Sequence, residues 1–127
     1  MLLDTHAFVW ALTTPDRLSD AARSAVSDRA HNLHVSAASV WEMAIKVRSG
    51  KWPDAEPIVA GVEALARRLG AIMVGIDGTD ARCAGLLDWG HRDPFDRMLA
   101  AQATNRQFPL ITRDTQFRNV TGLAVVW

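Results

Sequence analysis

The sequence lacks the features of several specialised classes of protein. It has one cysteine, Cys83, so no intrachain disulfide can form, and a lone thiol fits a reducing compartment. No apolar run approaches the roughly 18 residues that cross a bilayer. The opening residues 1–4 show no basic segment leading into a long apolar stretch, so no secretory signal is expected. We therefore expect a cytoplasmic protein.

An excess of charge of either sign is also missing. The 14 basic and 14 acidic residues give a formal net charge of zero at pH 7. This balance argues against a protein that coats nucleic acid through a general basic excess. A local basic rim around an acidic site is still compatible with it, because most of the basic residues are arginines, which form bidentate contacts with phosphate.

The sequence does contain enough apolar residues for a buried core. Its 127 residues are 49% hydrophobic, and no repeat, linker or low-complexity tract divides them, so we expect one domain over residues 1–127. Apolar runs and helical spacing alternate along the chain. The predicted strands are 1–4, 33–35, 71–76, 110–112 and 123–126, and the predicted helices are 5–12, 20–29, 37–48, 56–69, 79–89 and 93–106. Strands separated by helices predict an α/β fold, with a parallel sheet covered on both faces.

Acidic residues gather at one edge of this predicted sheet. In an open parallel sheet, ligands bind beyond the carboxyl ends of the strands. Asp4 ends the first strand, and Asp114 follows the fourth strand closely. Asp93 and Asp96 open the helix before the fourth strand, and Glu42 lies in the helix after the second. We expect these acids, distant in sequence, to converge on one pocket.

Each acid also has an alternative, local role. Asp4 and Asp93 stand where helix N-caps are expected, and Asp96 lies in the first turn of a helix. Asp114 fits an Asx turn, and Glu42 has the spacing for an ion pair with a lysine one turn later. No single acid is therefore diagnostic, and the convergence of the set carries the inference.

A cluster of carboxylates predicts a bound cation. Carboxylates about 4 Å apart repel by roughly 4 kcal/mol per pair at an effective dielectric near 20, so protons or a cation must neutralise them. Oxygen ligands, without cysteine or histidine at zinc spacing, favour Mg²⁺, with Mn²⁺ as a substitute. Such an ion holds a phosphodiester and activates water, which indicates hydrolysis of nucleic acid without a covalent intermediate.

The segments that carry these acids resemble the motifs of a known family. Residues 2–5 (LLDT) are similar to the opening motif of PIN domains, especially of the VapC-type toxins, and residues 39–46 (SVWEMAIK) resemble the Glu-bearing helix of that family. Residues 91–103 (HRDPFDRMLAAQA) resemble its third acidic motif, and residues 110–114 (LITRD) the strand with its last acid. The resemblance extends over residues 1–127.

The resemblance implies a fold and a set of site residues. The fold would be a three-layer α/β/α PIN-like arrangement with a central parallel sheet of about five strands. Asp93 would be an accessory acid, and Thr112 would keep a hydroxyl near the site. The metal-binding acids would be Asp4, Glu42, Asp96 and Asp114.

The resemblance also implies a function. The chain would be an Mg²⁺-dependent endoribonuclease that cuts structured RNA (tRNA or rRNA), the toxin of a VapBC-type pair, inhibited by a VapB-type antitoxin and homodimeric. Two alternatives are open. One is a PIN-like module that binds RNA or an antitoxin without cutting. The other, a haloacid-dehalogenase-type phosphatase, needs a second Asp two residues after Asp4, where this chain has His6.

Four arginines lie near the motif acids in sequence. If the substrate is RNA, they are candidates for phosphate contacts, and the alternative is a solvated surface or pairing with the acids. The candidate RNA-binding residues are Arg92, Arg97, Arg113 and Arg118.

We expect structural roles for most of the histidines and tryptophans. His6 and His91 adjoin motif acids, but we expect them to be structural or exposed. Trp10, Trp41 and Trp127 are expected in the core or at a dimer contact, and Trp52, beside a proline, on an exposed partner surface.

Overall fold

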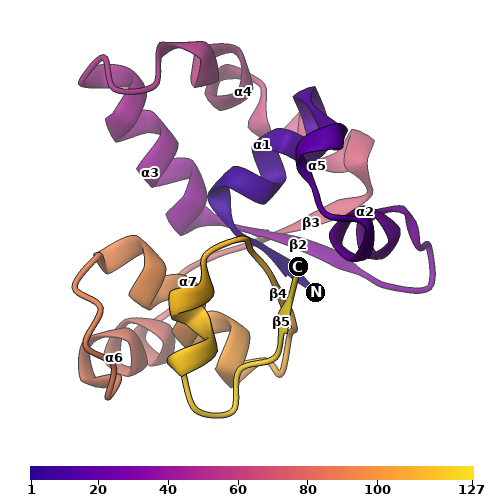
Figure 1. Cartoon of the computed structure of the whole chain (residues 1–127). Coiled ribbons are helices and arrows are strands. Elements are labelled where there is room, and N and C mark those ends of the chain that lie inside the picture. The colour runs from indigo at the N-terminus through magenta and orange to yellow at the C-terminus, as the bar shows by residue number, and fades with distance from the viewer.

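A parallel sheet organises the chain, and the computed structural model describes all of it, residues 1–127. The sheet has five strands in the order β3-β2-β1-β4-β5, and every neighbouring pair is parallel (Figure 1). The strands are β1 (Leu2–Leu3), β2 (Leu33–Ser36), β3 (Ala71–Val74), β4 (Leu110–Ile111) and β5 (Val125–Val126). β1 lies at the centre of the sheet and pairs with β2 on one side and β4 on the other.

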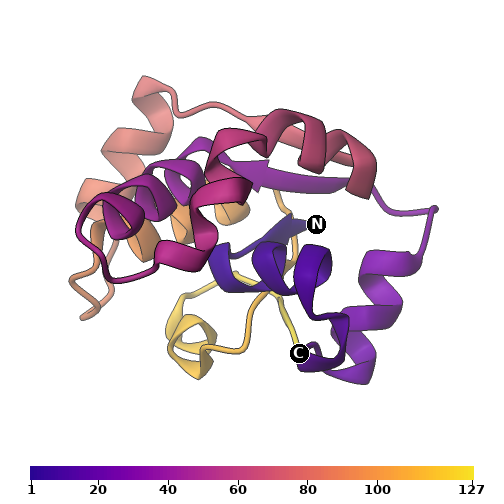
Figure 2. The same ribbon diagram turned by 90° about the horizontal axis from the view of Figure 1, so that it is seen from above.

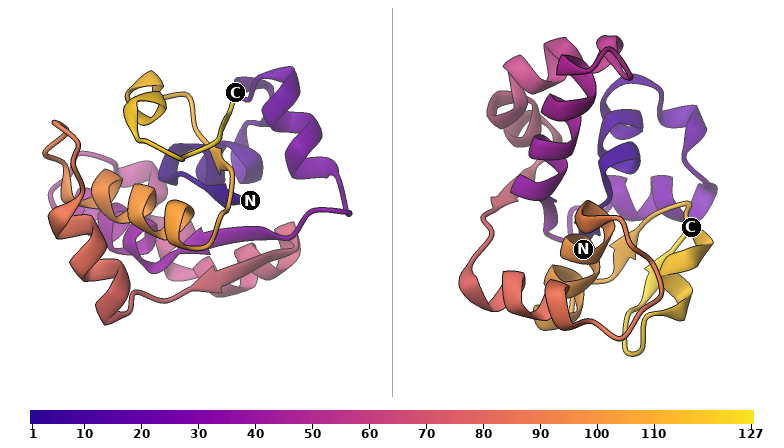
Figure 3. Two further views of the ribbon diagram at one scale, coloured as in Figure 1. Left: turned by 90° about the horizontal axis from the view of Figure 1, so that it is seen from below. Right: turned by 90° about the vertical axis from the view of Figure 1, so that its left-hand side faces the viewer.

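Helices connect the strands. They are α1 (Thr5–Thr13), α2 (Asp20–Ser27), α3 (Ala37–Arg48), α4 (Glu56–Ala60), α5 (Val62–Leu69), α6 (Gly78–Leu86) and α7 (Pro94–Asn105), with short 3₁₀ turns η1 (Pro15–Arg17), η2 (Pro53–Ala55) and η3 (Thr115–Asn119). In Figure 2 the helices surround the central strands, and α6 and α7 pack side by side in both views of Figure 3. None of the helices combines the length and apolarity needed to cross a bilayer.

Alternation of side chains along the strands divides the core in two. Leu3 and Ile111 belong to a cluster with residues of α1, α2 and α5, whereas Leu2 and Leu110 pack against α7 and η3. Successive residues of a strand point to opposite faces, so both faces are apolar and both need a covering layer. The structure therefore confirms the expected three-layer α/β/α fold and its five parallel strands.

The predicted helix over residues 56–69 is wrong in one respect. The chain forms two helices there, separated at Gly61, which has φ −118° and ψ 21°. The apolar spacing continues through this point, with Ile58 and Ala66 both buried. Glycine is about 1 kcal/mol less favourable than alanine inside a helix, so little stability is lost when the helix is interrupted at Gly61. The bend still lets each of the two helices bury an apolar residue. The other predicted elements occur, and their ends agree with the prediction to within three residues.

A buried ion pair joins α6 to the end of α7 on one face of the sheet. The side chain of Asp80 on α6 is 1% exposed and accepts hydrogen bonds from Arg106 Nη1 at 2.6 Å and Nη2 at 2.9 Å. Gln102 Nε2 donates a third bond at 3.1 Å. Burial alone would raise the pKa of Asp80, but the bonds from Arg106 and Gln102 outweigh it and lower the pKa to about 2. The carboxylate therefore stays ionised and ties α6 to the end of α7.

Removal of this charge should destabilise the fold in a pH-dependent way. We expect Asp80→Asn to lower the free energy of unfolding at pH 7 by about 3 kcal/mol, because Arg106 loses its buried partner. The pKa of Asp80 is below its ordinary value of 3.8, so this stability is present above about pH 4 and is lost as the pH falls toward about 2. Urea unfolding at several pH values measures the difference. Asp88→Asn, an exposed position, is the control. A difference that does not shrink in acid would contradict the assignment.

Candidate metal and catalytic site

The five predicted acids line one cavity. Asp4 follows β1 and Asp114 follows β4, so both lie at the carboxyl edge of the sheet. Asp93 and Asp96 reach the same edge because α7 runs back against the strands and begins there. The cavity has a volume of about 160 Å³, and its lining residues are Asp4, Thr5, His6, Glu42, Lys46, Asp93, Asp96, Asp114 and Phe117.

Three of the acids are held in place as caps. Oδ1 of Asp4 accepts the Ala7 N–H at 2.6 Å, and Oδ1 of Asp93 accepts the Phe95 N–H at 2.8 Å. Oδ1 of Asp114 likewise accepts the N–H of Gln116, at 2.8 Å. The local capping roles and the convergence on one cavity are therefore both correct. In each residue Oδ2 has no backbone donor, which leaves one oxygen for a ligand.

Glu42 is held differently, by side chains. Its residue is 7% exposed, and its two oxygens accept from Thr5 Oγ1 and from Lys46 Nζ, each at 2.5 Å. The ion pair with Lys46 that the spacing allowed is present, but the carboxylate lies in the cavity wall rather than on the surface. Lys46 and Thr5 together fix its orientation, and of these two only Thr5 was not singled out in the sequence.

Thr112 links the two strand ends. Its side chain is buried, and its Oγ1 accepts the backbone N–H of Asp114 at 3.0 Å, which fixes the turn after β4. Burial raises the pKa of Asp4, although the Ala7 N–H and a side-chain hydrogen bond with Thr112 favour the ionised form. These hydrogen bonds therefore do not fully offset the cost of burying the negative charge of Asp4.

His91 approaches the acids more closely than its sequence position suggested. Its Nε2 lies 2.6 Å from Oδ2 of Asp96. Burial raises the pKa of Asp96 to about 6, the contact with His91 works against this rise, and the charge of Asp93 adds to it. Ligand atoms of His91, Asp96 and Asp114 all lie within 4.8 Å of one another. The prediction from sequence, that His91 is structural or exposed, missed this contact. The position of His91, two residues before Asp93, does not match the spacing of zinc ligands and gave no other indication of a role in the site.

This donor set fits a divalent cation. Asp4, Asp93 and Asp114 each keep an oxygen that no backbone group uses, and carboxylate oxygen is the ligand that Mg²⁺ and Mn²⁺ prefer. Burial raises the pKa of Asp4 and of Asp96, so a bound cation would offset the cost of keeping these buried carboxylates ionised. Glu42, in contrast, already has Lys46 as its counter-charge.

Arg97 has a structural role instead of the expected phosphate contact. Its guanidinium donates to backbone carbonyls of Ala84, Gly85, Leu87, Trp89 and His91, over distances from 2.6 to 3.5 Å. These five bonds occupy all five of its N–H groups. Arg97 therefore holds the loop between α6 and α7, and we remove it from the set of candidate RNA-binding residues.

The other three arginines are free to meet a ligand. Arg92, Arg113 and Arg118 are exposed, and none of them pairs with a carboxylate. Arg113 lies over the ring of Trp10, with 5.0 Å from its Cζ to the ring centroid. Their role in phosphate binding stays a prediction.

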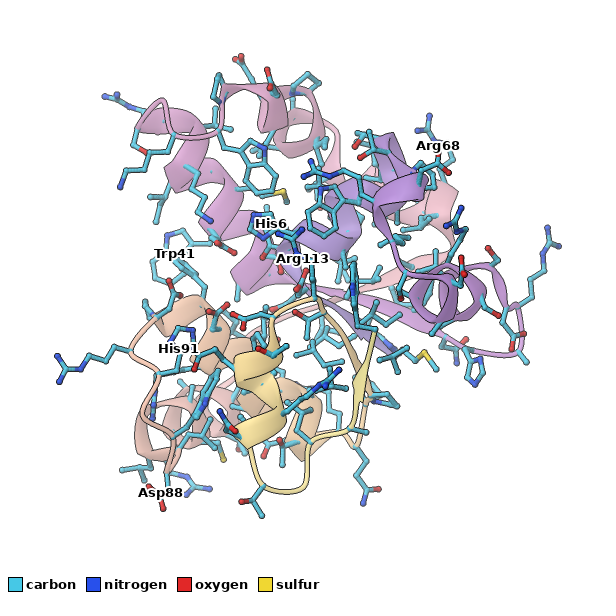
Figure 4. The ribbon with its side chains drawn as sticks, in the orientation of Figure 1. His6, Trp41, Arg68, Asp88, His91 and Arg113 are labelled. Atoms are coloured by element: carbon cyan, nitrogen blue, oxygen red, sulfur yellow. The ribbon has the colours of Figure 1, made fainter.

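The tryptophans are distributed unevenly. Trp10 is buried, and Trp127 packs against it with 5.9 Å between ring centroids, so these two belong to the core. Trp41 is 57% exposed and lies outside the core, which leaves the dimer contact as its predicted role. Trp52 is half-buried rather than exposed, because it stacks on His6 at 4.8 Å. Figure 4 shows His6 next to Arg113, and Trp41 at the periphery.

A divalent cation should stabilise the protein through the acids. We expect Mn²⁺ or Mg²⁺ to raise the melting temperature by several degrees, since an ion at about 100 times its Kd adds roughly 2.7 kcal/mol to the native state. Asp114→Asn should abolish most of this rise, and Asp88→Asn should retain it. Differential scanning calorimetry with and without the ion checks this. An equal rise in both variants would place the ion elsewhere.

The role of Arg97 separates it from Arg92, its matched control. Arg97→Ala leaves five carbonyls without their donor, so we expect it to lower the free energy of unfolding by about 3 kcal/mol. Arg92→Ala, at an exposed position, should change it by less than about 0.5 kcal/mol. Urea denaturation measures both. Equal stability of the two variants would disprove the structural role.

Comparisons with known proteins bear on the family and the fold. The family model of the PIN domain matches residues 1–123. Ribonuclease VapC22 of Mycobacterium tuberculosis is 32% identical over 120 residues, which span 94% of this chain and 90% of that protein. Among solved structures, VapBC2 from Rickettsia felis, bound to a DNA fragment from their promoter, has a chain that superimposes with a TM-score of 0.69. That match has 15% identity and covers 98% of this chain and 95% of the other, so it shows a shared fold.

Proposed function

Since this chain belongs to the PIN-domain family and to its VapC-type branch, we propose that it is an Mg²⁺-dependent endoribonuclease, the toxin of a VapBC-type toxin–antitoxin pair. One observation carries the proposal: acids from separate segments of the chain line a single cavity of about 160 Å³. The relative with 32% identity, which is named as a ribonuclease, supports the choice of RNA.

Three acids would hold the cation. Asp4, Asp96 and Asp114 form the proposed ligand set, with Asp93 as an accessory, because all four line the cavity. The bound ion would supply positive charge at the scissile phosphate and lower the pKa of water. The alternative, a module that binds without cutting, is less consistent with a complete set of acids.

Glu42 would position the attacking water. Its carboxylate is fixed on both oxygens, by Thr5 and Lys46, and faces the cavity. A preorganised acceptor orients a water without moving itself, and Lys46 adds a positive charge in the same wall. Attack by water on phosphorus would leave 5′-phosphate and 3′-hydroxyl ends. Thr112 would maintain the spacing between Asp4 and Asp114.

The substrate and partners follow as further parts of this proposal. We propose a structured RNA, such as a tRNA or rRNA, whose phosphates contact Arg92, Arg113 and Arg118. The expected protein partner is a VapB-type antitoxin, in line with the naming of the structural neighbour. Homodimerisation would cover the exposed apolar side chains of Trp41 and Ile45 on α3, since such side chains are costly to leave in water.

Cleavage of RNA with and without the acids tests the proposal. We expect the wild type to cut a mixture of tRNA and rRNA with Mg²⁺ and to stop with EDTA. Asp4→Asn should reduce the rate at least about 100-fold, while asparagine preserves the helix cap and hence the fold. Sequencing of the 5′ ends of the fragments gives the cut sites. Asp88→Asn is the control for a change of charge alone.

The chemistry of the ends decides the mechanism. Products with 2′,3′-cyclic phosphate would contradict attack by water, because the ribose hydroxyl would then be the nucleophile. A wild type that binds RNA and does not cut it under any of these conditions would favour the non-cutting module instead.

A further inference from the structure

A second, larger cavity adjoins the acids. It has a volume of about 570 Å³ and lies between α1, α3 and η2, and the residues that matter here are His6, Trp10, Arg17, Lys51, Trp52 and Arg113. We refer to these six residues as the aromatic groove.

The aromatic groove is continuous with the acid cavity. His6 and Lys46 line both cavities. A third hollow, of about 280 Å³, is lined by Asp4, Asp114, His6, Trp10 and Arg113 and so joins the two. A polymer with one phosphate at the acids therefore has an open path into the groove.

Positive charge in the groove has no partner in the protein. The guanidinium groups of Arg17 and Arg113 lie 4.8 and 5.0 Å from the centroid of the same ring, that of Trp10. Neither forms an ion pair, and nor does Lys51. Asp54 is the one acid in the lining, so cations outnumber it. Like charges gathered without a counter-charge are stabilised by an anion, just as the nearby acids are by a cation.

Flat aromatic surface lies beside these charges. His6 and Trp52 stack with 4.8 Å between centroids and 20° between planes. His6 is exposed and Trp52 half-buried, so the stacked pair is accessible from the groove. Proteins that bind single strands combine such platforms for bases with cations along the backbone.

We propose that the aromatic groove binds an unpaired nucleotide of RNA adjacent to the phosphate at the acids. Its base stacks on the His6–Trp52 pair, and its phosphates meet Arg17, Lys51 and Arg113. The assignment rests on the proposed nuclease function, since it takes the acid cavity as the place of the scissile phosphate. The unpaired cations favour a polyanion over a protein segment, and a platform for stacking requires a base whose face is free, hence a single-stranded region.

Binding of RNA by a non-cutting protein tests the groove. The full chain carrying Asp4→Asn is titrated with a single-stranded RNA oligonucleotide of mixed sequence and with the same sequence as a duplex. We expect an added Trp52→Leu to weaken binding of the single strand by about 5- to 100-fold, as for loss of one stacked base. Trp52→Phe, which keeps an aromatic face, should retain most of the affinity. Binding of the duplex should change less in both variants.

A lysine variant tests the phosphate contacts separately. Lys51→Ala should weaken binding and reduce the slope of log K against log salt by about 0.7, the value for one phosphate of a single strand. Arg68→Ala is the matched control, because Arg68 is exposed, lies on α5 and is remote from His6 and Arg113 in Figure 4. It should alter neither affinity nor slope.

The outcomes distinguish a failure of the groove assignment from a failure of the proposed nuclease function. Because binding is measured without cutting, a wild type that fails to cleave disproves only the proposed function. Unchanged affinity in both Trp52→Leu and Lys51→Ala, the result expected if a protein partner occupies the groove, would overturn the assignment. An equal loss in Arg68→Ala would overturn it too, since the effect would then be one of general charge.

Discussion

Mutual repulsion among carboxylates at the carboxyl edge of the central strands is the constraint on which this structure depends. The fold resists that repulsion by fixing the acids to backbone N–H groups, as at Asp4, Asp93 and Asp114. The same contacts that begin α1, α7 and η3 thus determine where the charges lie. The same contacts therefore set both the local helix geometry and the chemistry of the cavity. Burial, with the charge of Asp93 adding to its effect, raises the pKa of Asp96.

The elements of the fold that could be predicted are those determined by residues adjacent in sequence. Asp93 before Pro94 predicts a helix start correctly because the cap involves only adjacent residues. The break at Gly61 was missed since apolar spacing runs through it unchanged. The spacing predicts parallel strands and the resemblance implies about five of them, but neither predicted their order in the sheet, which depends on contacts between distant segments.

The site was predicted unevenly for the same reason. All five acids could be found: Asp4 and Asp114 follow strands, Asp93 and Asp96 stand at the start of α7, and Glu42 lies within the helix that follows β2. The contact of His91 with Asp96 depends on the path of a loop that has no periodicity, and so does the engagement of Arg97 by carbonyls. A formal net charge of zero likewise conceals a strong separation of charge, with acids in one cavity and unpaired cations in the next.

The guanidinium of Arg97 has a consequence for how the protein tolerates change. It binds backbone carbonyls from the last turn of α6 to His91, so these contacts depend on the path of the main chain and hardly on the side chains along it. Substitutions in this loop are then compatible with the fold, whereas the insertion or deletion of a single residue displaces the acceptors and, with them, the histidine beside the acids. The contacts of Arg97 therefore constrain the length of this segment more than its composition.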